Sequence, residues 1–160
     1  MRNMEKATKV FVTTLCSHLK EIHESIIKET GGLEGVRDEG GLFHSSWKIA
    51  EKLKNNEESI QIATFIFQEL AKKHHFNDGN KRTAYCSVKE FLFVHGLHFQ
   101  LEYRFAVDFI THIAKHNSPK TTREIKLWIK NNTHILETKD INSYLTYHYK
   151  DLEQMKETKK

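Results

Sequence analysis

The amino-acid sequence predicts a single all-α domain, a compact helical bundle with a glycine-rich flap or short hairpin and an extra helix at its C-terminal end. The chain of 160 residues contains one proline and seven glycines, too few helix breakers for a turn-rich β fold. Apolar residues recur at the spacing of one helix face, beginning with Phe11, Leu15, Leu19, Ile22 and Ile26. The length corresponds to one domain, residues 1–160, with one hydrophobic core.

The elements follow from the positions of the glycines and of the apolar residues. A first helix is expected to end at Gly31 and Gly32, because glycine tolerates the positive φ of a helix end. Residues 31–42 hold five of the seven glycines and are expected to form a loop or short hairpin. Further helices are expected over residues 43–54, 59–73, 81–95, 105–115, 121–128 and 140–155, with a short, ambiguous extended segment over 97–103.

Composition and charge exclude several classes of protein. The net charge of +4 comes from Lys and Glu mixed along the chain, with no basic stripe between aromatic residues, so direct nucleic-acid recognition is not expected. The chain has no apolar run long enough to span a bilayer and no signal-peptide pattern at its start. Two distant cysteines match no disulfide or metal spacing. We therefore expect a cytoplasmic protein without membrane contact.

Residues 74–84 form the segment with the clearest chemical meaning. Gly79 precedes a predicted helix, whose free N–H groups and dipole favour an anion, and Lys81 and Arg82 add positive charge there. Asp78 is a carboxylate suited to Mg²⁺, which prefers carboxylate and phosphate oxygens. His74 carries an imidazole, the side chain that most often acts as a general base. Together they indicate phosphoryl or nucleotidyl transfer, although each alone is also typical of a solvated face or an ordinary turn.

Two other enzyme classes are excluded by spacing. The eleven histidines include no His-Glu-x-x-His pattern, which argues against a metal-dependent hydrolase. The sequence also lacks the Gly-x-x-x-x-Gly-Lys-Ser/Thr pattern of a P-loop nucleotide-binding protein. The nucleotide chemistry must therefore come from the loop at residues 74–82.

This loop resembles the signature of the Fic/Doc family, His-x-Phe-x-Asp/Glu-Gly-Asn-Gly/Lys-Arg-x-x-Arg. Lys81 stands where most AMP-transferring members have glycine, and Tyr85 stands where they have a second arginine. Both departures resemble the Doc (death-on-curing) branch of toxins, as does the glycine-rich stretch at residues 31–42, so the resemblance covers about residues 22–96. The seven agreeing positions are His74, Phe76, Asp78, Gly79, Asn80, Lys81 and Arg82.

The resemblance implies a role for each matching residue. His74 would be the catalytic base, Phe76 the anchor of the loop, and Asp78 the Mg²⁺ ligand. Asn80 and Arg82 would complete the catalytic set, and the phosphates of the nucleotide would be bound by Gly79, Asn80, Lys81 and Arg82. An extended stretch of the target would dock by backbone pairing on the flap residues Gly31, Gly32, Leu33, Glu34, Gly35 and Val36.

The resemblance also implies an activity. A Doc-like toxin would transfer the γ-phosphate of ATP, with Mg²⁺, to a Ser or Thr hydroxyl of a target protein, the family's target being translation elongation factor Tu. The alternatives are AMP transfer by a Fic-type adenylyltransferase and a catalytically silent interaction module with the same fold. Three Ser/Thr-x-x-x-Glu spacings lack the Gly or Asn of the family's inhibitory helix, so a small antitoxin would act in trans in the cytoplasm of a bacterial or phage-infected cell. The tail over residues 140–155 is either a packing helix or a partner surface.

Overall fold

Seven helices and one two-stranded sheet are formed by the part of the chain that the computed structural model describes, which is residues 2–115 and 117–158, with side chains from residue 5 onward. This confirms the predicted all-α class. The elements are α1 (Arg2–Thr30), α2 (Glu39–Lys54), α3 (Ser59–Lys72), α4 (Asn80–Val94), β1 (Leu97–Phe99), α5 (Tyr103–Ala114), α6 (Thr122–Asn131), β2 (Thr133–Ile135) and α7 (Thr138–Glu157).

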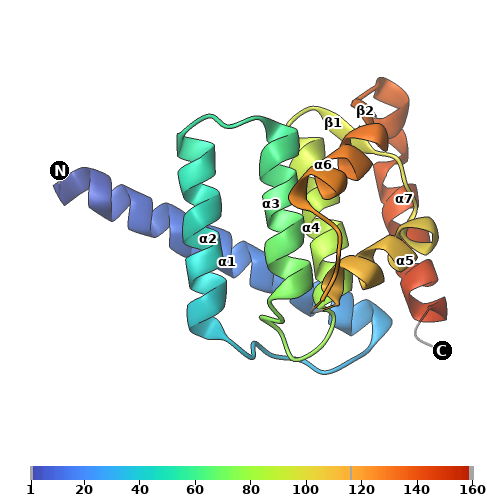
Figure 1. The fold of residues 1–160 in the computed structure, drawn as a ribbon, viewed down its shortest axis with the longest axis horizontal. Coiled ribbons are helices and arrows are strands. Elements are labelled where there is room, and N and C mark those ends of the chain that lie inside the picture. Colours follow the sequence, from blue (N-terminus) through green and yellow to red (C-terminus); the bar gives the residue numbers. More distant parts are fainter. Residues whose placement is uncertain (1, 116, 159–160) are drawn as a thin grey trace.

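Helices α3 and α4 lie side by side in the middle of the bundle, and the N-terminal end of α1 projects away from it (Figure 1). Helix α4 also contacts α1 and α5, and α7 packs against α5 and the far end of α1. The loop between α3 and α4 therefore lies at one end of this central helix pair (Figure 1). Helices on several sides can reach it, which is how the bundle positions the candidate site.

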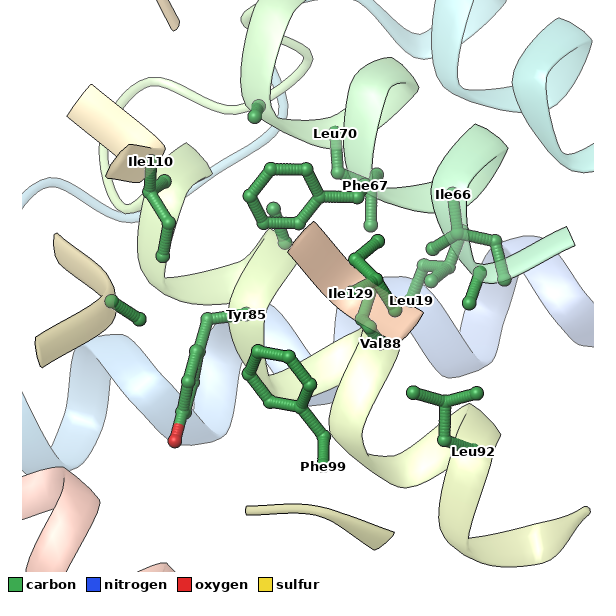
Figure 2. Packing of buried hydrophobic residues seen from close by; sticks show 14 of the residues in the cluster. Leu19, Ile66, Phe67, Leu70, Tyr85, Val88, Leu92, Phe99, Ile110 and Ile129 are labelled. Atoms are coloured by element: carbon green, nitrogen blue, oxygen red, sulfur yellow. The ribbon is translucent and has the colours of Figure 1, made fainter. Parts of the chain in front are cut away.

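The core is built mainly from the facing sides of α3, α4, α5 and α6 (Figure 2). Tyr85 is fully buried in it, with Phe99 and Tyr103 packed edge-on against its ring. The Tyr85 hydroxyl donates a hydrogen bond to the carbonyl of Leu101 at 2.8 Å and accepts one from Lys89 Nζ at 3.1 Å. A buried hydroxyl needs such partners, so the hydrogen-bonding capacity of Tyr85 is fulfilled within the core.

The expected helix ends are largely confirmed, with one correction. Helix α1 ends at Thr30, and Gly31 and Gly32 follow with φ of 84° and 123°. The prediction that residues 31–42 form a continuous loop is wrong, because residues 39–42 are the first turn of α2. The Asp38 carboxylate accepts a hydrogen bond from the Gly41 N–H at 2.8 Å and caps the helix, which outweighs the low helix propensity of two glycines.

The C-terminal third contains the small sheet and two capped helices. β1 pairs antiparallel with β2, and His98 lies directly opposite His134. The predicted capping box of α6 is confirmed, since Thr121 Oγ1 accepts from the Glu124 N–H at 3.2 Å and Glu124 Oε2 accepts from the Thr121 N–H at 2.8 Å. The tail is a helix as predicted, somewhat longer at Thr138–Glu157. Within the described residues, no helix combines the length and apolar character needed to cross a bilayer.

Candidate active site

The loop before α4 is closed on itself by the side chain of Asn80. Its Nδ2 donates to the carbonyl of Phe76 at 3.0 Å, and its Oδ1 accepts from the N–H of Phe76 at 3.0 Å. Both polar ends of the amide are therefore engaged with the backbone of one residue. Asn80 shapes the loop, while its own backbone N–H belongs to the first turn of α4.

The buried side chains of Phe76 and His23 anchor the loop to α1. Their rings stack at a centroid distance of 4.0 Å and an interplanar angle of 7°. His23 Nε2 donates to the carbonyl of Asp78 at 2.7 Å. Burial lowers the pKa of His23 below its ordinary value, and the hydrogen bond to Asp78 only partly opposes this. The imidazole is therefore neutral at pH 7 and acts as a support of the loop.

Gly79 joins the loop to α4 in a conformation that requires glycine. Its φ is 75°, and a Cβ at this position would lie 2.9 Å from Ile27 Cδ1. Gly79 is the N-cap of α4, and the first helical hydrogen bond runs from the Thr83 N–H to the Gly79 carbonyl at 2.9 Å. The N–H groups of Asn80, Lys81 and Arg82 consequently have no acceptor within the helix, and a helix N-terminus of this kind favours an anion.

Arg82 is almost completely buried, with 5% of its surface exposed, and it connects three segments. Nη1 donates to the Gly31 carbonyl at 2.8 Å and to the Thr30 hydroxyl, and Nη2 donates to Asp78 Oδ1 at 3.4 Å. The guanidinium therefore fixes the end of α1 and the start of the flap against the loop. It also places a permanent positive charge at the floor of the site.

Asp78 lies at the junction of the loop and the flap. Its Oδ1 accepts from the Gly79 N–H at 2.7 Å, and its Oδ2 accepts from the Leu33 N–H at 3.3 Å. The side chain remains 39% exposed and borders the cavity described below. A carboxylate in this position fits a Mg²⁺ ion that is also bound by phosphate oxygens.

A cavity of about 520 Å³ lies over the N-terminus of α4. It is lined by the loop, by α5 and by the C-terminal end of α7. Its wall carries four cations, Arg37, Lys81, Arg82 and Lys115, against the single carboxylate of Asp78. The remaining lining residues are Ala71, His74, Asn77, Gly79, Asn80, Tyr103, Val107, Thr111, Ala114, Met155 and Thr158.

His74 stands at the entrance of this cavity. It is exposed, and its backbone has a φ of 49°, a left-handed conformation that is uncommon for a residue with a side chain. Such conformations occur at functional sites where the surrounding structure maintains them. Here the neighbouring residue His75 supplies that support.

The sequence indicated no role for His75, yet its backbone and side chain anchor the loop. It is fully buried, and its carbonyl accepts from the N–H groups of Arg37 at 2.7 Å and Asp38 at 3.1 Å. Its Nε2 lies 2.9 Å from the Ser45 hydroxyl, which donates to Glu69 Oε2 at 2.6 Å. Burial lowers the pKa of His75, with the Glu69 charge opposing. This buried group holds the backbone from which His74 projects.

The flap, residues 31–36, is attached to the loop along one edge. Val36 forms an antiparallel bridge with Phe76, and the Gly35 carbonyl accepts from the Asn77 N–H at 3.0 Å. Because the residues on either side of the bridge make these bonds, the N–H and carbonyl of Val36 point to the opposite edge. The flap lies beside the cavity, and its neighbour Arg37 is the residue that reaches the cavity wall.

The structure thus places six of the seven predicted loop residues around one cavity, with Phe76 buried behind them, and adds others that the sequence did not indicate. Arg37 and Lys115 contribute to its positive wall, and His23 and His75 support the loop from behind. Tyr85, at the position of the family's second arginine, lies in the core and lines no part of this cavity. The sequence shows that Arg37 directly follows the flap, but it does not show that the Arg37 side chain lines the cavity.

Comparison with known families agrees with this geometry. The sequence model of the Fic/DOC family matches residues 13–92, which is 80 of the 160 residues. The matched segment includes α1 from residue 13 onward, the flap, the loop and nearly all of α4. A search of curated proteins found no match. The match and the site show that the chain belongs to the Fic/DOC family, whose members typically use ATP and transfer a nucleotide-derived group to a target protein.

Proposed function

We propose that this protein is a Doc-like toxin that transfers the γ-phosphate of ATP to a Ser or Thr hydroxyl of a target protein, with elongation factor Tu as the target that the family suggests. The observation that carries the proposal is the charge of the cavity. Four cations and the N-terminus of α4 face a space of about 520 Å³ that contains one carboxylate. A triphosphate with one Mg²⁺ matches that charge distribution.

Two positions support phosphate transfer over AMP transfer. Lys81 is exposed at the cavity wall and adds bulk and charge where AMP-transferring members have glycine. In AMP-transferring members, the second arginine would bind a γ-phosphate that points away from the target hydroxyl. Here Tyr85 occupies that position and is buried in the core, so it offers no such ligand. Both features favour a nucleotide whose γ-phosphate faces the target hydroxyl.

The reaction assigns a distinct task to each residue. The target oxygen forms a bond to the γ-phosphorus while the bond from that phosphorus to the β–γ bridging oxygen breaks, and the hydroxyl proton passes to His74. The N–H groups at the start of α4, with Lys81 and Arg82, stabilise the phosphate charge. Mg²⁺, held by Asp78 and phosphate oxygens, would neutralise the charge that develops on the leaving ADP.

The flap supplies a docking edge for the target. An extended segment of the target could pair with the free edge at Val36, whose opposite edge is engaged by the loop. This pairing would present a hydroxyl to His74 at the cavity entrance. Since the sequence lacks the family's inhibitory motif, we propose that a small antitoxin controls the enzyme in trans.

Intact mass spectrometry of elongation factor Tu after incubation with the protein, ATP and Mg²⁺ tests the proposal. A gain of one phosphate that is lost with His74→Ala is the expected result. A gain of AMP would keep the roles of the loop but replace the proposed activity with adenylylation. No modification, together with no binding of ATP to the cavity, would support the silent interaction module.

A further inference from the structure

A second cluster of polar side chains lies at the corner where β1, β2 and the start of α7 meet. His98 and His134 are directly opposite each other in the antiparallel pair, and Asp140 is in the first turn of α7. One ligand atom from each residue lies within 4.8 Å of the others. Among the described side chains, this is the one group of three His, Cys, Asp or Glu residues with that property.

The cluster is not a closed hydrogen-bond network, because one of its contacts is longer than a hydrogen bond. His98 Nε2 lies 3.9 Å from Asp140 Oδ1, which is too far for a hydrogen bond. His134 Nε2 lies 2.9 Å from Asp140 Oδ2. Ligand atoms of a tetrahedral zinc site are about 3.3–3.5 Å apart, given Zn–N and Zn–O bonds of about 2.0–2.1 Å, so small side-chain movements would satisfy the geometry.

The hydrogen bonds around the cluster resemble the outer shell of a metal site. His134 Nδ1 lies 3.1 Å from Gln100 Oε1, to which it donates. With Nδ1 donating, the Nε2 atom on the Asp140 side can present its lone pair to a metal ion. The carboxylate is itself oriented by the Glu137 N–H, which donates to Asp140 Oδ2 at 2.9 Å.

The surroundings leave the site available to a cation. The cluster borders a cavity of about 260 Å³, and each of the three lysines around that cavity is paired with a carboxylate. The pairs are Lys89 with Asp151 at 2.7 Å, Lys150 with Glu102 at 2.7 Å, and Lys139 with Glu137 at 3.4 Å. His98 and Asp140 are buried, and the half-exposed His134 faces the opening.

We propose that His98, His134 and Asp140 bind one divalent transition-metal ion, with zinc as the expected ion and a water molecule as its fourth ligand. Two imidazole nitrogens and one carboxylate oxygen are typical of zinc and unlike the all-oxygen ligands of Mg²⁺. The ion links the small sheet to the start of α7. The far end of that helix contributes Met155 and Thr158 to the nucleotide cavity, so the metal stabilises one wall of the candidate active site.

Metal titration of the full-length protein without an affinity tag tests this site. Calorimetry with Zn²⁺ should give one high-affinity site per chain, and Co²⁺ should give the visible absorption of a four-coordinate ion. His134→Ala and Asp140→Asn should each weaken zinc binding by at least about 100-fold, as expected for lost ligands. His44→Ala is the matched control, because His44 is an exposed histidine on α2 outside the cluster, and it should bind zinc as the wild type does.

A variant of a residue that is not itself a ligand tests whether the loss of zinc binding is caused by misfolding. Gln100→Ala should lower zinc affinity by about 10–100-fold while the fold is retained, since Gln100 only orients His134. Equal zinc affinity in the wild type, Gln100→Ala and His134→Ala would overturn the proposal and place the ion at another histidine. Absence of stoichiometric zinc binding to the wild type would likewise overturn it and identify the cluster as a polar network only.

Discussion

The two polar sites of this protein both lie at the N-terminus of a helix, yet the side chains around them differ in charge. The first turn of α4 contains Lys81 and Arg82 and no acidic residue, whereas the first turn of α7 contains Asp140 and a lysine, Lys139, that is paired with Glu137. At α4 the positive side chains add to the positive end of the helix dipole, and this concentration of positive charge favours an anion. At α7 the carboxylate offsets the dipole and faces two imidazoles, which favours a metal cation. The ligand is therefore determined by side chains in the first turn.

The largest expected effect tests the α4 site. His74→Ala should reduce transfer to the target by about 10²–10⁴-fold, because it removes the general base. The rate of target modification, followed by intact mass, measures this effect, with His44→Ala as the exposed-histidine control. Full activity in His74→Ala would mean that another group accepts the proton.

The next effect concerns the ion pair that lies between the two sites. Asp151 of α7 pairs with Lys89 of α4 at 2.7 Å, and its Oδ1 accepts from the Tyr103 N–H at 3.0 Å. Asp151→Ala should lower the free energy of unfolding by about 3–5 kcal/mol, because Lys89 then remains buried without an opposite charge and keeps only the Tyr85 hydroxyl as a partner. Urea denaturation measures it. The double variant Lys89→Met/Asp151→Ala should recover part of the loss, and a loss equal to that of the single variant would contradict this explanation.

Two glycines allow the energetic cost of backbone strain to be measured separately from the cost of a steric clash. Gly79 in the loop and Gly96 after α4 have nearly the same φ, 75° and 76°. A Cβ at Gly79 would lie 2.9 Å from Ile27 Cδ1, whereas a Cβ at Gly96 would meet no atom within 4 Å. Gly96→Ala should cost about 1–2 kcal/mol from backbone strain alone, and Gly79→Ala should cost at least about 1 kcal/mol more. Equal losses in urea denaturation would show that the loop is not tightly packed on α1.

The smallest effect is a dependence of stability on pH. Burial lowers the pKa of His23 and of His75 in the folded protein, so protonation favours the unfolded chain. Their contribution is fully present above the unfolded pKa of about 6.5 and is lost as the pH falls below it. The urea midpoint should therefore decrease between pH 7.5 and 5.5, and His23→Gln should reduce that decrease. A midpoint that does not change in this range would show that neither histidine is held neutral.

The difference between the two sites also explains how much could be predicted from the sequence. The loop is contiguous, so His74, Asp78, Gly79, Asn80, Lys81 and Arg82 could be assigned to one site from their spacing. The proposed metal site could not be predicted, because it depends on the pairing of His98 with His134 and the β2 strand was not predicted. Likewise, Arg37 and Lys115 reach the cavity only through the tertiary packing of the flap and α5.

Errors in the predicted fold have local causes. Gly40 and Gly41 suggested a loop, but the Asp38 cap begins α2 before them. The tail helix was predicted, with its role left open between packing and a partner surface. It packs through Leu152 and Met155, its last turn lines the cavity, and Leu145 and Tyr149 remain exposed. Helix periodicity predicts that one face is buried but not which element it contacts.

One measurement tests the contrast between an anion site and a cation site most directly. Amide NMR spectra of the ¹⁵N-labelled protein can be recorded in two separate titrations, one with ATP and Mg²⁺ and the other with Zn²⁺. The account predicts that ATP shifts the amides of Asn80, Lys81 and Arg82 to saturation and that zinc instead shifts those around His98 and His134. If ATP leaves the start of α4 unchanged, the central claim that this helix N-terminus binds a nucleotide is contradicted.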